Sequence, residues 1–470
     1  MKTMAVLACL VAASAVSSLN DSLAYPEDTP IVEAARGVVS ELSSGKHGAL
    51  HARFDATMKA ALPEEKVPEM WKSIVAQFGS FQSQGAARQE KSGGFDIVFV
   101  TCQFEKGAME LRVVFNAERQ VAGLFLAPAA AGASATSAKR PQEPKKPYPY
   151  REEEVSYASM EEGVKLAGTL TMPESGGPFP VVLLISGSGA QNRDEEIMGH
   201  KLFLVMADHM TRRGIAVLRV DDRGVGGSSA GSPMATSLNF AQDVMGGVSY
   251  LKSRKEMNPR KIGLIGHSEG GIVAPFVASR SGDVAFIVLM AAPGVSGREI
   301  LLEQIKRMSK AGGASEQQIA ENIKYENIVL DILSETPNDE AAEMRIREAL
   351  SGNPAVRDAV QLQMKTALSQ WFRHFIHYHP RPALEKVKCP VLAINGEKDL
   401  QISPSQNLPE IESALVAAGN KDYKIVELPG LNHLFQTCKT GSVSEYGQIE
   451  ETISPVALQL ISDWIVAHAR

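Results

Sequence analysis

The stretch Lys261-Ile-Gly-Leu-Ile-Gly-His-Ser-Glu-Gly-Gly271 joins a short apolar run to a turn bounded by glycines, and the apolar segment 272–278 follows it. The run is typical of a buried parallel strand, and the segment after the turn can continue as a packed helix. So sharp a turn strains the backbone at Ser268, and side chains at positions 266 and 270 would collide with the neighbouring strand and helix. The stretch therefore predicts a strand, a tight turn and a helix, with the Ser268 hydroxyl standing clear of a parallel sheet.

Two residues further along the chain are suited to assist Ser268. A serine hydroxyl is a weak nucleophile near neutral pH, so it needs a base within hydrogen-bonding reach and a carboxylate that orients this base. Asp399 lies in the polar turn after the apolar run 390–396, and His433 lies on the loop after the strand predicted at 423–428. Serine, acid and histidine follow in the order expected when Gly-x-Ser-x-Gly carries the nucleophile. We predict the triad Ser268, Asp399 and His433.

Each partner has a competitor. Glu397 is a second carboxylate two positions before Asp399, and Asp399 itself could be a turn residue without a catalytic role. His468 lies on the amphipathic segment 455–469, which predicts the surface of a C-terminal helix. The place of Asp399 just before Leu-Gln-Ile-Ser-Pro favours it over Glu397.

Acyl transfer also requires two backbone N–H groups that stabilise the oxyanion. Glu269, the residue after the serine, is positioned to give one of them. The glycine-rich loop 186–191 after the apolar strand 179–185 is suited to give the other, from Ser188 or, as second choice, Gly189.

These motifs together resemble the α/β-hydrolase superfamily, and more narrowly bacterial esterases that carry a small extra domain ahead of the hydrolase. The resemblance covers about residues 150–470 and implies a mostly parallel sheet flanked by helices. Ser186 departs from it, because many members have histidine before the loop glycine. The motifs that carry it stand in the expected order: Ser186-Gly-Ser-Gly189, Val220-Asp-Asp-Arg-Gly-Val-Gly-Gly-Ser228, Gly266-His-Ser-Glu-Gly270, Asn395-Gly-Glu-Lys-Asp399 and Gly430-Leu-Asn-His433.

The chain divides into four predicted parts. Residues 1–24 have the lysine, apolar run and small residues of a secretory signal, which predicts a periplasmic or secreted protein. Residues 28–126 alternate between helical and strand patterns, which predicts a small α+β domain without a recognisable catalytic set. Residues 127–150 are rich in Ala, Ser, Pro and Lys, as in an exposed linker. The α/β-hydrolase domain spans 151–470 and contains a mostly helical insertion at about 296–382, predicted to cap the serine.

Several other residues have structural as well as functional interpretations. Asp222 and Arg223 are predicted to form a charged turn that supports the site loops, and Trp371 and Phe372 could line the pocket or simply pack. His374 and His377 would share a helix face and His379 follows them, but no Cys or clear carboxylate completes a metal site. Cys389 and Cys438 could form one bridge in an oxidising compartment, although free buried cysteines are the commoner outcome.

The sequence predicts a serine carboxylesterase acting on small to medium acyl esters, with a small-molecule substrate and no cofactor or metal. A net charge of −6 argues against nucleic acid as a partner, and no long apolar run away from the N-terminus predicts a membrane span. The same triad would serve a thioesterase, a lactone hydrolase or an aminopeptidase, and a non-catalytic binding protein on this scaffold is the alternative from another class. The N-terminal domain is expected to recruit a partner, to mediate homo-oligomers or to shield the site.

Overall fold

The computed structural model describes residues 30–55, 58–59, 62–92, 95–105, 107–128 and 140–469. These residues form two compact units that divide just before Arg140. The predicted signal peptide, residues 1–24, and residues 129–139 of the predicted linker lie outside the described residues. None of the helices in the described ranges is long and apolar enough to cross a bilayer.

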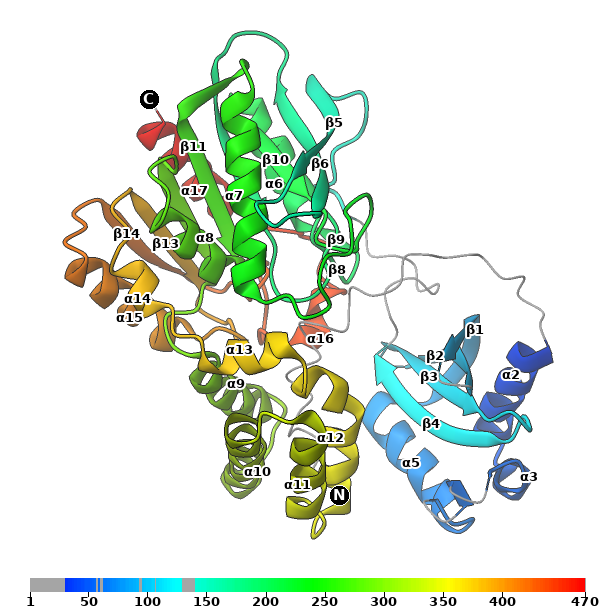
Figure 1. Ribbon diagram of the computed structural model, residues 1–470. Helices are drawn as coiled ribbons and strands as arrows, with labels where there is room; N and C mark the ends of the chain where they lie inside the picture. The colour runs from blue at the N-terminus through cyan, green and yellow to red at the C-terminus, as the bar shows by residue number, and fades with distance from the viewer. Residues whose placement is uncertain are drawn as a thin grey trace. The chain divides into compact units, whose positions relative to one another are not determined.

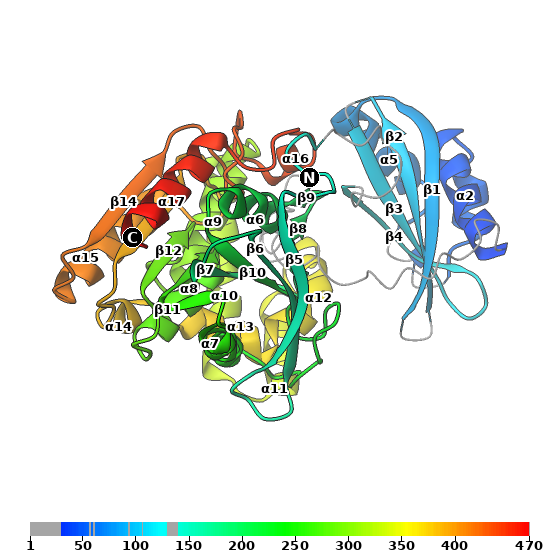
Figure 2. The same ribbon diagram turned by 90° about the horizontal axis from the view of Figure 1, so that it is seen from above.

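The N-terminal unit packs helices against one face of an antiparallel sheet (Figure 2). The helices are α2 (Pro30–Ser43), α3 (His47–Ala52) and α5 (Lys66–Phe78), and the strands, in spatial order, are β1 (Phe81–Ser92), β2 (Phe95–Phe104), β3 (Gly107–Phe115) and β4 (Val121–Pro128). Helix α3 ends at Ala52, and Phe54 just after it forms a β-bridge with Val121. Strand β1 was not expected.

The second unit is built on an eight-stranded sheet (Figure 1). Strands β10 to β14 and β7 run parallel, whereas β5 and β6 pair antiparallel at one edge. In spatial order the strands are β14 (Tyr423–Leu428), β13 (Val391–Gly396), β12 (Phe286–Met290), β11 (Met257–His267), β7 (Phe179–Ile185), β10 (Ala216–Val220), β6 (Lys165–Pro173) and β5 (Tyr150–Ala158). This is the α/β-hydrolase arrangement that the sequence predicts.

Helices cover both faces of this sheet and bury an apolar core on each side (Figure 1). One face carries α7 (Ser237–Ser253), α8 (Gly270–Ala278), α14 (Arg381–Leu384) and α15 (Pro404–Ala417). The other carries α6 (Leu202–Arg212) and α17 (Pro455–His468). The short elements β8 (Glu196–Ile197), β9 (His200–Lys201) and α16 (Val443–Tyr446) lie in the connecting loops.

The segment between β12 and β13 forms a helical cap with its own apolar core. Ser296 caps its first helix, where the side-chain oxygen accepts the backbone N–H of Glu299. The cap core includes Ile272 of α8, so the cap packs on the helix that follows the Ser268 turn. Its helices are α9 (Gly297–Ala311), α10 (Glu316–Glu335), α11 (Asp339–Ala349), α12 (Pro354–Ala367) and α13 (Gln370–His377).

The part of the predicted linker from residue 140 onward differs from an exposed linker. The Arg140 guanidinium donates hydrogen bonds to the backbone carbonyls of Met198, Gly199, Gly447 and Ile449. Five donors on one planar group can satisfy several loop carbonyls at once, which fixes this segment on the hydrolase unit. Composition alone gave no sign of this anchor.

Candidate active site

The turn after β11 holds Ser268 in a left-handed backbone conformation, with φ of 51°. A Cβ added at Gly266 would lie 2.1 Å from the carbonyl oxygen of Gly270, and one added at Gly270 would lie 2.2 Å from that of Ile185. Both glycines are therefore required by close backbone approach, as the sequence predicts. The strained turn brings the serine to the carboxyl edge of the sheet, at the N-terminus of α8.

Asp399 and His433 meet at the same edge. His433 Nδ1 lies 2.7 Å from Asp399 Oδ2, and both side chains are buried. The other oxygen of Asp399 accepts the backbone N–H groups of Gln401 and Ile402, each at 2.8 Å. An acceptor at Nδ1 fixes the tautomer of His433 that carries its proton there and leaves Nε2 free to accept one.

His433 lies close to the Ser268 turn, although no hydrogen bond joins the two side chains in the described part of the chain. The ring of His433 is 4.9 Å, centroid to centroid, from that of His267, the residue before the serine. Catalytic hydrogen bonds are often long without a substrate and shorten when one binds. The three residues of the predicted triad thus gather in one region.

The competing residues lie elsewhere. The exposed Glu397 carboxylate accepts the backbone N–H of Gly430 at 2.8 Å and so supports the start of the loop that carries His433. His468 Nδ1 contacts the backbone carbonyl of Trp464 in the same helix at 2.8 Å, and its Nε2 contacts Asp422. Neither residue contacts Ser268 or His433.

The loop after β7 approaches Ser268 closely. A Cβ added at Gly187 would lie 3.2 Å from the Cβ of Ser268, so only glycine leaves the serine free there. The backbone N–H of Gly187 is already committed, because it donates to Glu195 Oε1 at 2.7 Å. Within the described residues, the N–H groups of Ser188 and Glu269 have no protein acceptor, which keeps them available for an oxyanion.

The carboxyl group of Glu269 connects the serine turn with the cap. Its Oε1 accepts hydrogen bonds from the Ser237 hydroxyl of α7 at 2.5 Å and from Trp371 Nε1 of α13 at 2.8 Å. Burial raises the pKa of Glu269, against these hydrogen bonds and one from Ser188, which lower it. Trp371 therefore fixes one cap helix above the residue next to Ser268, while Phe372 is fully buried in the cap core.

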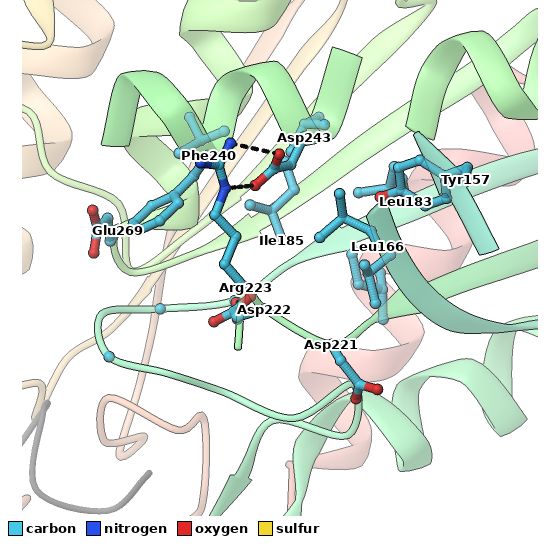
Figure 3. Close-up of a pocket in the computed structure, with 17 residues that line it drawn as sticks. Tyr157, Leu166, Leu183, Ile185, Asp221, Asp222, Arg223, Phe240, Asp243 and Glu269 are labelled. Atoms are coloured by element: carbon cyan, nitrogen blue, oxygen red, sulfur yellow. Dashed lines mark hydrogen bonds and ion pairs between the residues drawn. The ribbon is translucent and has the colours of Figure 1, made fainter. Parts of the chain in front are cut away.

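A small cavity of about 50 Å³ lies behind the loop after β7 (Figure 3). Four acidic residues line it: Asp221 and Asp243 are paired with arginines, whereas no cationic side chain of the described residues pairs with Asp222 or Glu269. Desolvation raises the pKa of Asp222 to about 8, and the nearby carboxylates add to this effect. Arg223 is held by Asp243 instead, with contacts of 2.6 and 2.8 Å.

Asp222 also supports the loop, as the sequence predicts. Its carboxyl oxygens accept the Ser186 hydroxyl at 2.8 Å and the Gln191 backbone N–H at 2.9 Å. Ser186, which stands where many related enzymes have histidine, thus has a definite structural partner.

Two residues near the site were not singled out from the sequence. The buried Glu195 carboxylate contacts His267 Nδ1 at 2.8 Å, and His267 Nε2 contacts the backbone carbonyl of His433 at 3.1 Å. His267 lies inside the Gly-x-Ser-x-Gly pattern and could have been noticed there. Glu195 gives no such signal, because its partner is 72 positions away in the sequence.

The described residues contain no group of three or more His, Cys, Asp or Glu side chains arranged to hold a metal ion. Cys102, Cys389 and Cys438 are free thiols, so the bridge considered between Cys389 and Cys438 is not formed.

Comparison with known proteins gives two family matches. A family model described as X-Pro dipeptidyl-peptidase (S15 family) matches residues 162–412, and a model described as a protein of unknown function (DUF3887) matches residues 35–124. Esterase EstD of Thermotoga maritima is 25% identical over 379 residues, which cover 80% of this chain and 81% of EstD.

Solved structures of hydrolases are also similar. The Pyrococcus furiosus esterase Pf2001 is 15% identical with a TM-score of 0.42, over 71% of this chain and 98% of that one. The α/β hydrolase GrgF of a Penicillium species is 18% identical with a TM-score of 0.42, over 68% of this chain and 99% of that one.

Proposed function

This chain belongs to the X-Pro dipeptidyl-peptidase (S15) family and is a hydrolase, and from that premise we propose that it is a carboxylesterase that cleaves small to medium acyl esters through Ser268, His433 and Asp399. The observation that carries the proposal is the contact of 2.7 Å between His433 and Asp399 beside a serine in a strained turn. The similarity to an esterase from Thermotoga maritima supports ester over amide cleavage.

The reaction follows from this arrangement in two halves. Ser268 Oγ attacks the ester carbonyl while His433 Nε2 takes its proton, and Asp399 stabilises the imidazolium that results. The N–H groups of Glu269 and Ser188 bind the oxyanion, with Gly189 as the alternative to Ser188. Collapse of the intermediate releases the alcohol, which takes the proton from His433. Water then attacks the acyl-enzyme by the same route and frees the acid and Ser268.

The cap supports the choice of a small to medium acyl group. Trp371 is hydrogen-bonded to Glu269 at 2.8 Å, directly beside the nucleophile, and it stacks on Phe375 with ring centroids 5.6 Å apart. An indole held against the side chain of the residue after Ser268 would limit the length of an acyl chain and help to exclude water from the acyl-enzyme.

The test is hydrolysis of p-nitrophenyl esters from acetyl to dodecanoyl by the wild-type protein and by Ser268→Ala. We expect turnover by the wild type with an optimum at short or medium chains, and none above background with Ser268→Ala, whose loss is on the order of 10⁶ in kcat. Lys310→Ala, at an exposed position of cap helix α9, is the control for protein preparation and should match the wild type. Ester turnover that survives in Ser268→Ala would contradict the proposal.

A second candidate, an aminopeptidase-type hydrolase, is favoured by the cavity behind the loop after β7, which is lined by Glu269, the residue after Ser268. Asp222 and Glu269 are carboxyl groups without a cationic partner among the described residues, so they offer an ammonium group of a substrate a place to bind. Aminoacyl p-nitroanilides assayed beside the esters separate the two functions. A higher kcat/KM for the anilides, lost in Glu269→Gln but retained for acetyl esters, would favour the peptidase.

A further inference from the structure

A second imidazole–carboxylate pair lies directly beneath the nucleophile. His267 and Glu195 are 1% and 0% exposed, and His267 Nδ1 lies 2.8 Å from Glu195 Oε1. The other ring nitrogen of His267 lies 3.1 Å from the backbone carbonyl oxygen of His433. Both nitrogens of this imidazole are therefore occupied by protein atoms.

The protons of this pair can be assigned from its partners. A backbone carbonyl only accepts, so His267 Nε2 must carry a proton and donate it to His433. Glu195 Oε1 faces two donors, the N–H of Gly187 at 2.7 Å and Nδ1 of His267. A ring with a proton on each nitrogen can donate to both of its acceptors, whereas a ring with a proton on Nε2 alone would have to accept one from Glu195.

The pair links two parts of the site that are far apart in the sequence. Through Gly187 it holds the loop that is expected to bind the oxyanion, and through its contact with the main chain of His433 it holds the loop of the proposed base. Ser268 follows His267 directly, and a Cβ at Gly187 would touch it. A shift of the first loop would move the expected oxyanion-binding N–H group relative to Ser268, and a shift of the second would move the imidazole of His433.

The local conformation and environment of Glu195 are energetically unfavourable. Its backbone has φ of 46°, and its second carboxylate oxygen, Oε2, is buried and has no hydrogen-bond partner among the described residues. Its own N–H donates to the carbonyl of Asn192, and Arg193 beside it is paired with Asp221 at 2.7 Å. Strain and an unsatisfied carboxylate oxygen persist where the surrounding structure enforces them, most often at functional sites.

We propose that Glu195 and His267 are positioning residues, which hold the His433 loop and the loop around Gly187 in register with Ser268. The proposal rests on the proposed function, because it assigns these two residues to the same esterase site. Neither residue exchanges a proton with the substrate, since both nitrogens of His267 are committed.

Two substitutions of His267 test it. His267→Leu has a similar size and no donor, whereas His267→Gln keeps an N–H that can reach the carbonyl of His433. His209→Gln is the matched control, because the imidazole of His209 is a half-buried structural group bonded to Ser462 at 2.9 Å, between α6 and α17. The readouts are kcat and KM for the best p-nitrophenyl ester, and the rate at which a fluorophosphonate labels Ser268.

We expect His267→Leu to lower kcat and the labelling rate by about 10²-fold with little change in KM, because misplacement of about 1 Å costs this much. Both kcat and the labelling rate should be at least tenfold higher in His267→Gln than in His267→Leu. His209→Gln should behave as the wild type. Equal rates in His267→Leu and the wild type would overturn the proposal, and so would a His267→Gln variant no better than His267→Leu.

Folding is followed by circular dichroism and thermal unfolding of each variant. If His267→Leu does not fold, Glu195→Gln takes its place: it keeps the shape and an acceptor but removes the charge, and it should lower kcat about tenfold at unchanged KM. An unchanged kcat in Glu195→Gln would overturn the proposal. A wild-type protein that neither turns over esters nor reacts with the fluorophosphonate would instead refute the proposed function, and the positioning role with it.

Discussion

Two imidazole–carboxylate pairs lie side by side at the carboxyl edge of the sheet, and they differ in the use of the second ring nitrogen. The contacts within the pairs are 2.7 Å for His433 with Asp399 and 2.8 Å for His267 with Glu195. His433 Nε2 has no protein partner within the described residues, whereas His267 Nε2 is bonded to a backbone carbonyl. An imidazole with a free nitrogen can exchange protons, and one with both nitrogens committed can only hold its neighbours in place.

The carboxylates differ as well. Both oxygens of Asp399 have partners: one accepts two backbone N–H groups of its own turn, and the other is bonded to His433. Glu195 has a left-handed backbone, and one of its oxygens has no partner in the part of the chain that the structure describes. The first pair is built by a local turn that a sequence can reveal, and the second is enforced by distant parts of the fold.

The largest expected effect comes from His433. Among the described residues, His433 is the only histidine near Ser268 with a free ring nitrogen, so His433→Ala should lower kcat for the best ester by about 10⁶. Steady-state kinetics with a p-nitrophenyl ester measures it, with His468→Ala as the surface control. If His433→Ala keeps activity within about tenfold of the wild type, His433 is not the proton-exchanging imidazole that distinguishes the first pair from the second.

The next effect concerns the acid. Asp399→Asn should lower kcat by about 10⁴, because the amide favours the wrong tautomer of His433 and cannot stabilise the imidazolium. Glu397→Gln is the matched control, because within the described residues the Glu397 side chain bonds only the N–H of Gly430. Its kcat should stay within about twofold of the wild type. Equal losses of kcat in both variants would contradict the assignment of the acid role to Asp399.

Much of this site could be predicted because its signals are local. The glycines around Ser268 are required by atoms within the same turn or the adjacent strand, and Asp399 stands in a turn that follows an apolar run. The strands β7 and β14 begin and end at the predicted residues, since each is a compact apolar run bounded by turn residues.

The features that escaped prediction depend on distant partners. Strand β1 reads Phe-Gln-Ser-Gln-Gly-Ala-Ala-Arg-Gln-Glu-Lys-Ser and has weak strand propensity, so its conformation comes from its pairing with β2. The anchor at Arg140 and the contact of Glu195 with His267 likewise join segments far apart in the sequence. No local pattern encodes such contacts.

The smallest expected effect tests where the proton of the second pair lies. The pKa of His267 is raised: burial lowers it, but the charge and hydrogen bond of Glu195 outweigh this. A group whose pKa is higher in the folded state stabilises the fold fully below its unfolded pKa, about 6.5, and loses that contribution as the pH rises through the folded pKa.

The side chain of Gln in His267→Gln cannot titrate. The melting temperature of the wild type should therefore exceed that of His267→Gln most below pH 6.5, and the gap should narrow at higher pH. Asp222, whose pKa is raised to about 8, titrates in the same range but is present in both proteins, so its effect cancels. Thermal unfolding of both proteins at a series of pH values measures the gap. A gap that stays constant or widens would mean that the shared proton lies on Glu195, and that His267 holds the main chain of His433 as a neutral ring.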